Sequence, residues 1–164
     1  LVLLAAGAAL LWMARRQQAA LGLPAGEIVA IDDLPHRRLA HALYDPAQDL
    51  AGRPDLLLQQ GRRWIPVEAK SMPAPRPPYP SHVMQLAAYC LLIEAVYGER
   101  PPWGILRYAD RALRIDYTPA LEARLRQVLA DMRADRAAAP DRSHESAARC
   151  RACGVRAACN RALP

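Results

Sequence analysis

The stretch DLLLQQGRRWIPVEAK, residues 55–70, decides the fold. Two apolar runs flank a turn at Gln60 and Gly61, an arrangement that predicts a β-hairpin. In the second strand Glu68 and Lys70 are two residues apart, so they share one face, while the apolar residues between and before them alternate onto the other. The sequence therefore predicts a charged pair set apart from the core on one face of the hairpin.

The same hairpin brings a second carboxylate near this pair. A two-residue turn at Gln60-Gly61 places Asp55 opposite Pro66 and diagonal to Glu68, about 7–8 Å away along the sheet. Both carboxylates then reach one cation, and the pair suits Mg²⁺ or Mn²⁺, hard ions that take oxygen ligands and bridge to phosphate.

Lys70 completes the candidate catalytic set of Asp55, Glu68 and Lys70. A lysine beside a metal-bound water can orient or deprotonate that water and neutralise the charge that develops in the transition state. The set suits phosphodiester hydrolysis. The alternative is that Asp55 caps the strand and that Glu68 and Lys70 form an exposed ladder pair.

The segments around the hairpin predict an α/β fold. We expect strands at 27–31, 104–108 and 112–117, a stiff proline-rich loop at 71–82, and helices at 83–97 and 119–135. The first helix follows Ser81 as its N-cap and ends at Gly98. Residues 34–54 show no clean period and are expected to be a loop with a turn of helix or a short strand. These elements predict a small mixed sheet of about four or five strands packed against two helices.

Gln85 and Tyr89 interrupt the otherwise apolar helix predicted at 83–97. Because they are four residues apart, they lie on one face of that helix, which the proline-rich loop delivers beside the sheet. There they can contact a phosphate or hold the water and the lysine. The alternative is a helix edge from which the tyrosine extends its hydroxyl to water.

Three motifs together carry a resemblance to a known family. They are Gly52-Arg53-Pro54-Asp55, Val67-Glu68-Ala69-Lys70 and Gln85-Leu86-Ala87-Ala88-Tyr89. In this order and spacing they resemble the PD-(D/E)XK nuclease superfamily, in its RecB-like branch. The resemblance implies a restriction-endonuclease-like core within residues 26–164, with Asp55 and Glu68 as metal ligands, Lys70 as a catalytic residue, and Gln85 and Tyr89 on the DNA side.

The activity that this resemblance implies is that of a divalent-metal-dependent DNA nuclease, most simply an exonuclease acting on ends or single strands. Two other functions stay open. One is a catalytically weak nucleic-acid-binding or structural module of nuclease fold tethered to a membrane, and the other is a membrane-tethered zinc-ribbon adaptor.

Cys150, Cys153 and Cys159 lie close together in the basic segment 140–164. Such a density indicates metal ligands, with exposed free thiols as the alternative. A four-cysteine site suits a [4Fe–4S] cluster, whereas His144 with the three cysteines suits a structural Zn²⁺ site. The segment resembles the tails of CRISPR-associated RecB-like iron–sulfur exonucleases and of the Dna-two nuclease domain.

The chain departs from those relatives at two ligands. Their fourth cluster ligand is a cysteine upstream of the nuclease motifs, but here no cysteine precedes Cys90, which we expect in the core. Either His144 or an exogenous ligand completes the site, or the segment holds zinc or an incomplete cluster. The branch also commonly has a metal-binding histidine before the aspartate, for which His41 is the candidate here, with His36 and His82 as minor ones.

The first residues of the chain are strongly apolar. Residues 1–13 read LVLLAAGAALLWM and precede Arg15 and Arg16. The run is shorter than the roughly 20 residues that cross a bilayer, so it predicts part of a membrane anchor within residues 1–20. The positive-inside rule then places the body on the cytoplasmic side, tethered to the inner face of the membrane. The alternatives are a buried or docking helix and, less favoured, a signal peptide.

Composition limits the class of protein and its partners. With 52% apolar and 23% charged residues, the 164-residue chain is neither a polytopic membrane protein nor wholly disordered. A formal net charge of +6 favours a polyanionic partner such as DNA. The family resemblance adds proteins of CRISPR adaptation or of DNA repair as candidate partners.

Overall fold

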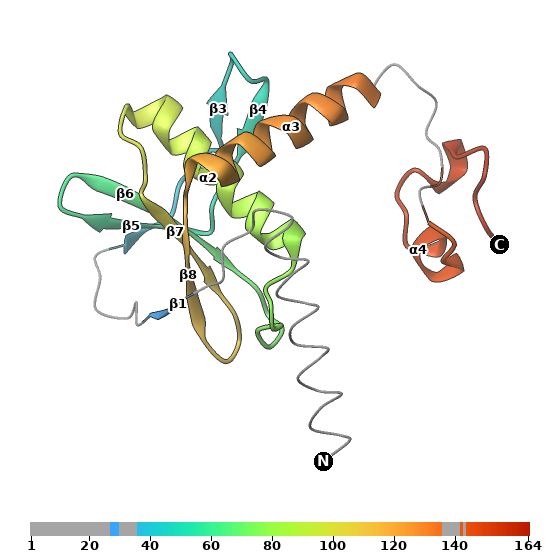
Figure 1. The fold of residues 1–164 in the computed structure, drawn as a ribbon, viewed down its shortest axis with the longest axis horizontal. Helices are drawn as coiled ribbons and strands as arrows, with labels where there is room; N and C mark the ends of the chain where they lie inside the picture. The colour runs from blue at the N-terminus through green and yellow to red at the C-terminus, as the bar shows by residue number, and fades with distance from the viewer. Residues whose placement is uncertain (1–26, 30–35, 136–141, 143) are drawn as a thin grey trace. The chain divides into compact units, whose positions relative to one another are not determined.

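A computed structural model describes residues 27–29, 36–135, 142 and 144–164. The chain divides into two compact units, residues 1–125 and 126–164, and each is described by itself. The first unit contains a six-stranded sheet in the order β1-β8-β7-β6-β5-β2 (Figure 1). Its strands are β1 (Glu27–Val29), β2 (His36–Arg37), β5 (Leu56–Gln60), β6 (Arg63–Ala69), β7 (Trp103–Arg107) and β8 (Ala112–Asp116).

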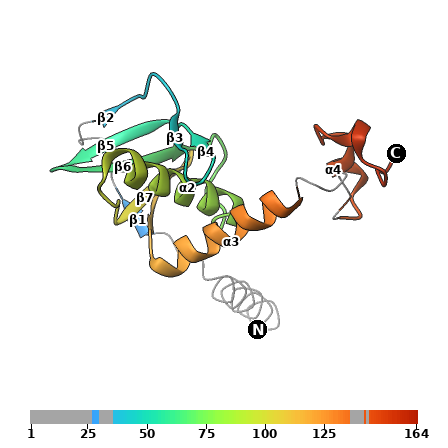
Figure 2. The same ribbon diagram turned by 90° about the horizontal axis from the view of Figure 1, so that it is seen from above.

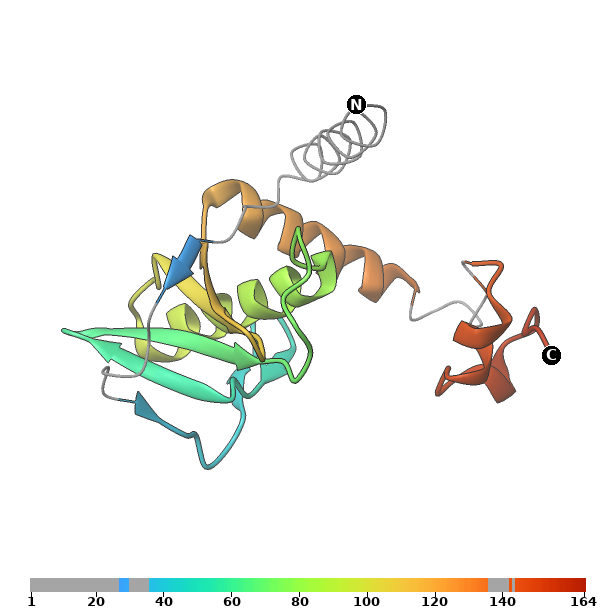
Figure 3. The same cartoon turned by 90° about the horizontal axis from the view of Figure 1, so that it is seen from below.

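The sheet is mixed, as the sequence predicts. β6 and β7 run parallel, and all the other neighbouring strands are antiparallel. Helix α2 (Pro80–Tyr97) connects the parallel pair and packs on one face of the sheet (Figure 2). The α/β class is confirmed, but the sheet has six strands where four or five were expected, because the two-residue β2 adds to the edge beside β5 (Figure 3).

Helix α2 begins earlier than the sequence predicts. Its first residue is Pro80 and its N-cap is Tyr79, so the assignment of Ser81 as the cap was wrong. Proline suits the first helical position because its ring presets φ and its missing N–H has no partner there in any case. The predicted end is confirmed, since Gly98 caps the helix with φ 75°.

The β5–β6 hairpin turns one residue later than expected. Gln60 pairs with Arg63, which leaves Gly61 and Arg62 as the turn, and Gly61 takes the positive φ of 61°. The register is therefore shifted by two residues, and Leu56 pairs with Val67. This shift keeps every side chain on its predicted face and brings Asp55 to the end of the ladder opposite Glu68 rather than diagonal to it.

Residues 34–54 contain a second hairpin, where the sequence predicted mainly a loop. β3 (Leu43–Asp45) pairs with β4 (Leu50–Gly52), and both contact α2. Strands of three residues are too short to show an alternating pattern. The turn between them is set by Asp45, which is buried and accepts a hydrogen bond from the Ala47 amide at 2.9 Å.

The core forms where α2 lies against the middle of the sheet. Gly104 of β7 allows the closest approach, because a Cβ there would lie 2.8 Å from Cγ of Leu86 on α2. Cys90 is buried as expected, and burial raises the pKa of its thiol. After β8 the chain enters α3 (Pro119–Asp135), with the bounds that the sequence predicts.

The second unit continues α3 into a segment with little regular structure. It contains the short helix α4 (Ala147–Arg151), capped by the Ser146 hydroxyl, and one 3₁₀ turn, η1 (Arg156–Ala158). The anchor predicted within residues 1–20 lies outside the described residues. Among the helices that are described, none is both long and apolar enough to cross a membrane.

Candidate active site

The predicted carboxylates both lie where β5 begins and β6 ends. Asp55 precedes β5, and its Oδ2 accepts a hydrogen bond of 2.8 Å from the Ala69 amide on β6. Glu68 is the residue before Ala69 and is buried, whereas Asp55 is exposed. The hairpin therefore holds one carboxylate at the surface and the other just inside it.

Lys70 is fixed from three directions. Its Nζ donates to Glu68 Oε1 and to Gln85 Oε1, each at 2.8 Å. Its backbone amide donates to the Arg107 carbonyl at 2.7 Å, which continues the pairing of β6 with β7. An ammonium held by two oxygen acceptors and a paired backbone has little freedom, so the lysine is positioned before any substrate arrives.

Gln85 and Tyr89 extend this network along α2. Gln85 Nε2 donates to the Tyr89 hydroxyl at 2.9 Å, so the predicted shared face of the helix is confirmed. Burial raises the pKa of Tyr89, and the nearby Glu68 and Asp55 carboxylates raise it further. The tyrosine therefore stays protonated and can donate a hydrogen bond.

Gly52 makes room for the Tyr89 ring. A Cβ at position 52 would lie 2.9 Å from Tyr89 Cε1 and 3.0 Å from Leu92 Cδ1. The glycine that opens the Gly-Arg-Pro-Asp motif thus lets β4 pass directly over the ring. Through this contact the strand that leads to Asp55 is aligned with the helix that carries Gln85.

His82 lies one helical turn before Gln85, and two further tyrosines contact its ring. His82 Nδ1 is 2.9 Å from the Tyr108 hydroxyl, and its ring meets that of Tyr79 edge to face, with centroids 5.3 Å apart. Burial and the positive charge of Lys70 lower the pKa of His82. Sequence reasoning named His82 as a minor candidate and missed Tyr108, whose only signal was its place at the end of a predicted strand.

The donor set suits a hard divalent cation. Mg²⁺ is usually held by one or two carboxylates together with water and substrate phosphate, so Asp55 and Glu68 fit that requirement. His41 is exposed in the loop before β3. Within the described part of the chain, no three His, Cys, Asp or Glu side chains are grouped closely enough to hold a metal ion. The ligand roles of Asp55, Glu68 and His41 remain predictions.

Comparison with known families agrees with this geometry. The family model of the PD-(D/E)XK nuclease superfamily matches residues 3–160. The chain belongs to the PD-(D/E)XK nuclease superfamily. The match does not extend to the RecB-like, CRISPR-associated branch, which stays a prediction. No curated protein matches the chain.

The cysteines of this superfamily member are not gathered into one site. Cys150 is buried and its Sγ accepts a hydrogen bond from the Leu163 amide at 3.4 Å. Cys153 is exposed and Cys159 is half-buried. The His144 imidazole accepts from the Ser146 amide at 3.1 Å through Nδ1, so that nitrogen already has a partner.

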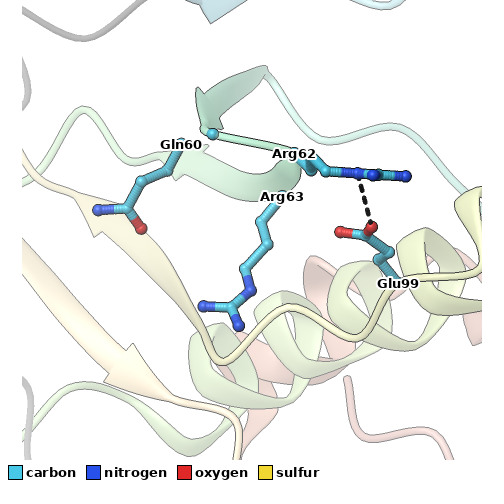
Figure 4. Close-up of a pocket in the computed structure, with 5 residues that line it drawn as sticks. Gln60, Arg62, Arg63 and Glu99 are labelled. Atoms are coloured by element: carbon cyan, nitrogen blue, oxygen red, sulfur yellow. Dashed lines mark ion pairs between the residues drawn. The ribbon is translucent and has the colours of Figure 1, made fainter.

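The nuclease domain also has a hollow at the far end of the hairpin. Gln60, Gly61, Arg62, Arg63 and Glu99 line it, and Arg62 Nε lies 3.7 Å from Glu99 Oε1 (Figure 4). Glu68 is five residues along β6 from Arg63, about 16 Å at the rise of a strand. The hollow is therefore separate from the group around Lys70, and it contains one exposed ion pair rather than a catalytic set.

Proposed function

We propose that this protein is a divalent-metal-dependent DNA nuclease that hydrolyses phosphodiester bonds, with exonuclease action as the favoured mode. One observation carries the proposal, namely that Lys70 Nζ bonds both Glu68 and Gln85 while the Asp55 carboxylate bonds the backbone next to Glu68. Membership of the superfamily supports a metal-dependent nuclease. The specificity for DNA and the exonuclease mode rest on sequence.

The proposed roles follow from the placement of each group. Asp55 and Glu68 hold Mg²⁺ or Mn²⁺, which when bound supplies Lewis-acid polarisation of the phosphate and an activated water. Lys70 lies against Glu68 and orients the attacking water or stabilises the negative charge that builds up on the phosphate oxygens. Gln85 holds the lysine at its working position, and Tyr89 donates a hydrogen bond on the DNA side.

The burial of Glu68 argues against a module that is only structural. A carboxylate that is 6% exposed has lost most of its hydration, and a hydrogen-bonded ammonium compensates that loss only in part. A fold that needs stability alone gains as much from an apolar pair of the same size. Retaining Asp55, Glu68 and Lys70 together is accounted for by chemistry at that position.

The test is degradation of end-labelled single-stranded and double-stranded DNA by anaerobically purified protein, with Mg²⁺, Mn²⁺ or EDTA. We expect metal-dependent degradation that falls at least about a hundredfold in Glu68→Ala. Glu99→Ala is the matched control, because it removes a glutamate at the separate hollow. A closed circular substrate that resists degradation supports the exonuclease mode. Equal degradation by wild type and Glu68→Ala would contradict the proposal, and degradation by neither would favour the binding module.

A second proposal concerns the cysteine segment. We infer that Cys150, Cys153 and Cys159 bind a metal, as a [4Fe–4S] cluster or as Zn²⁺ with His144. The support is their density in the sequence, and the described side chains are not assembled around a site. Iron, zinc and acid-labile sulfide in anaerobically purified protein decide between the two, and a protein without any of the three contradicts the proposal.

Attachment to the membrane through residues 1–13 and cooperation with CRISPR adaptation or DNA-repair proteins are further predictions from sequence. The first is checked by whether the full chain sediments with membranes and whether deletion of residues 1–13 releases it. A chain that stays in the supernatant contradicts it.

A further inference from the structure

We propose that Tyr79 is a stacking platform for an unpaired nucleobase next to the scissile phosphate, which makes single-stranded DNA the preferred substrate. The inference rests on the proposed nuclease function and names the substrate class of the same site. It starts from an aromatic ring that the fold holds at the edge of the lysine site and leaves in contact with solvent.

Tyr79 is placed by its position on α2. It is the N-cap of the helix, and His82 and Gln85 follow at intervals of three residues, so all three lie along one face. Gln85 bonds Lys70 at 2.8 Å, and His82 lies one turn before it, about 4.5 Å along the helix axis. Tyr79 therefore stands at the start of this series, about 9 Å along the helix axis from Gln85.

The Tyr79 ring is held in place by its contact with His82. Tyr108 is buried, its hydroxyl is 2.9 Å from His82 Nδ1, and the His82 ring meets Tyr79 at an interplanar angle of 76°. The preceding loop is tied to the β7–β8 turn, where the Ala74 amide donates to Asp110 Oδ1 at 2.7 Å. A ring positioned in this way loses little freedom when a base stacks on it.

The ring nevertheless stays open to a ligand. Tyr79 is 47% exposed. In an edge-to-face pair the His82 ring covers at most one face of the tyrosine, and nearly half of the residue remains exposed to solvent. Aromatic side chains of this kind bind successive bases of single strands without regard to sequence. In a duplex the bases are already stacked and paired, so the same ring offers duplex DNA little.

Binding without cleavage tests the inference. Fluorescence anisotropy of a labelled 15-nucleotide oligothymidine and of a hairpin duplex, in EDTA, measures affinity with the full-length protein. We expect Tyr79→Ala to bind the single strand about tenfold more weakly, Tyr79→Phe to bind within about twofold of wild type, and duplex affinity to be unchanged. Tyr44→Ala is the matched control, because Tyr44 is also an exposed tyrosine, at 53%, but belongs to β3 and not to the series Tyr79, His82 and Gln85.

An oligonucleotide with one abasic position, moved along the strand, sharpens the test. At one position the missing base should weaken binding to wild type and have no effect on Tyr79→Ala, since each change removes the same stack. Tyr79→Ala binding like wild type overturns the inference, and so does equal loss for the single strand and the duplex or equal loss in Tyr44→Ala. Cleavage is scored separately. If the wild type cleaves DNA and Tyr79→Ala keeps full affinity, the nuclease proposal stands and the role of Tyr79 is contradicted. If the wild type does not cleave DNA but its affinity for single strands depends on Tyr79, the nuclease proposal is contradicted and base stacking on Tyr79 is supported.

Discussion

Two regions of this protein carry clusters that the sequence predicts to bind metal, and they differ in how far the fold assembles them. Around β5 and β6, Lys70 lies 2.8 Å from both Glu68 and Gln85. In the segment 144–164, Cys150 is buried while Cys153 is exposed, and the thiols are not gathered. The fold brings the groups around Lys70 together, whereas it does not bring the three thiols together.

The difference follows from what supports each cluster. The carboxylates, the lysine and the glutamine lie on two strands and a helix that share a core, so packing fixes their separations before any ligand binds. The cysteine segment contains one helix of five residues and one 3₁₀ turn. With so little core, the free energy for gathering the thiols would have to come from the proposed metal, as is usual for small metal sites.

The largest expected effect comes from breaking the assembled site at its centre. Lys70→Ala removes the group that joins Glu68 to Gln85, and we expect the rate of metal-dependent cleavage to fall about 10²–10³-fold. Lys70→Arg should recover little, because the planar guanidinium differs in shape from the compact ammonium that contacts both Glu68 and Gln85. Single-turnover kinetics on end-labelled DNA measure both variants. Arg62→Ala is the control, since Arg62 is almost fully exposed at the other end of the hairpin. A cleavage rate for Lys70→Ala within tenfold of the wild-type rate argues against a catalytic role for the lysine.

A pair of glycines compares the two regions through stability. Gly52→Ala places a Cβ 2.9 Å from the Tyr89 ring and should lower the free energy of unfolding by about 1–3 kcal/mol. Gly154, in the cysteine segment, has nothing within 4 Å of its Cβ position, so Gly154→Ala should leave that free energy nearly unchanged. Urea denaturation followed by circular dichroism measures both. Equal loss in the two variants shows that the cysteine segment is packed more tightly than its side chains indicate.

The sequence predicted the assembled site better than its surroundings, and the reasons are local. The alternation that separates Glu68 and Lys70 from their apolar neighbours survives a shift of register, so a turn misplaced by one residue left the face correct. The four-residue spacing of Gln85 and Tyr89 likewise depends only on helix geometry. Both predictions rest on a period that the chain repeats over many residues.

What the sequence missed depends on contacts between distant segments. β3 and β4 are three residues each and show no period. The need for a glycine at position 52 arises from the Tyr89 ring, and the partner of His82 is Tyr108, which lies 26 residues away. For the cysteines, density indicated ligands, but spacing alone does not place thiols around a common point.

The cysteine segment offers a smaller effect that separates its metal-free form from a metal-bound one. Cys150→Ala removes the acceptor of the Leu163 amide, and in chelator-treated protein we expect that amide to exchange its hydrogen about fivefold faster, which corresponds to about 1 kcal/mol. Cys153→Ala should not change the exchange, because Cys153 is exposed. Hydrogen exchange followed by NMR measures the Leu163 amide in both variants. In metal-bound protein, each of the two substitutions should instead release the metal, and both should accelerate exchange of the Leu163 amide equally.

The smallest effect tests whether the charges of the assembled site are as close as the structure places them. His82 has a pKa below its ordinary value of 6.5, first because it is buried and second because Lys70 is positive. Unfolded protein therefore binds a proton at His82 more readily than folded protein does, so stability falls as the pH drops below 6.5 and is recovered above it. In Lys70→Met the pKa of His82 should rise part of the way back to 6.5, since burial remains. NMR titration of the His82 ring protons measures this rise. A pKa that does not respond to Lys70→Met places the ammonium too far from the series Tyr79, His82 and Gln85 to act with it on a phosphate.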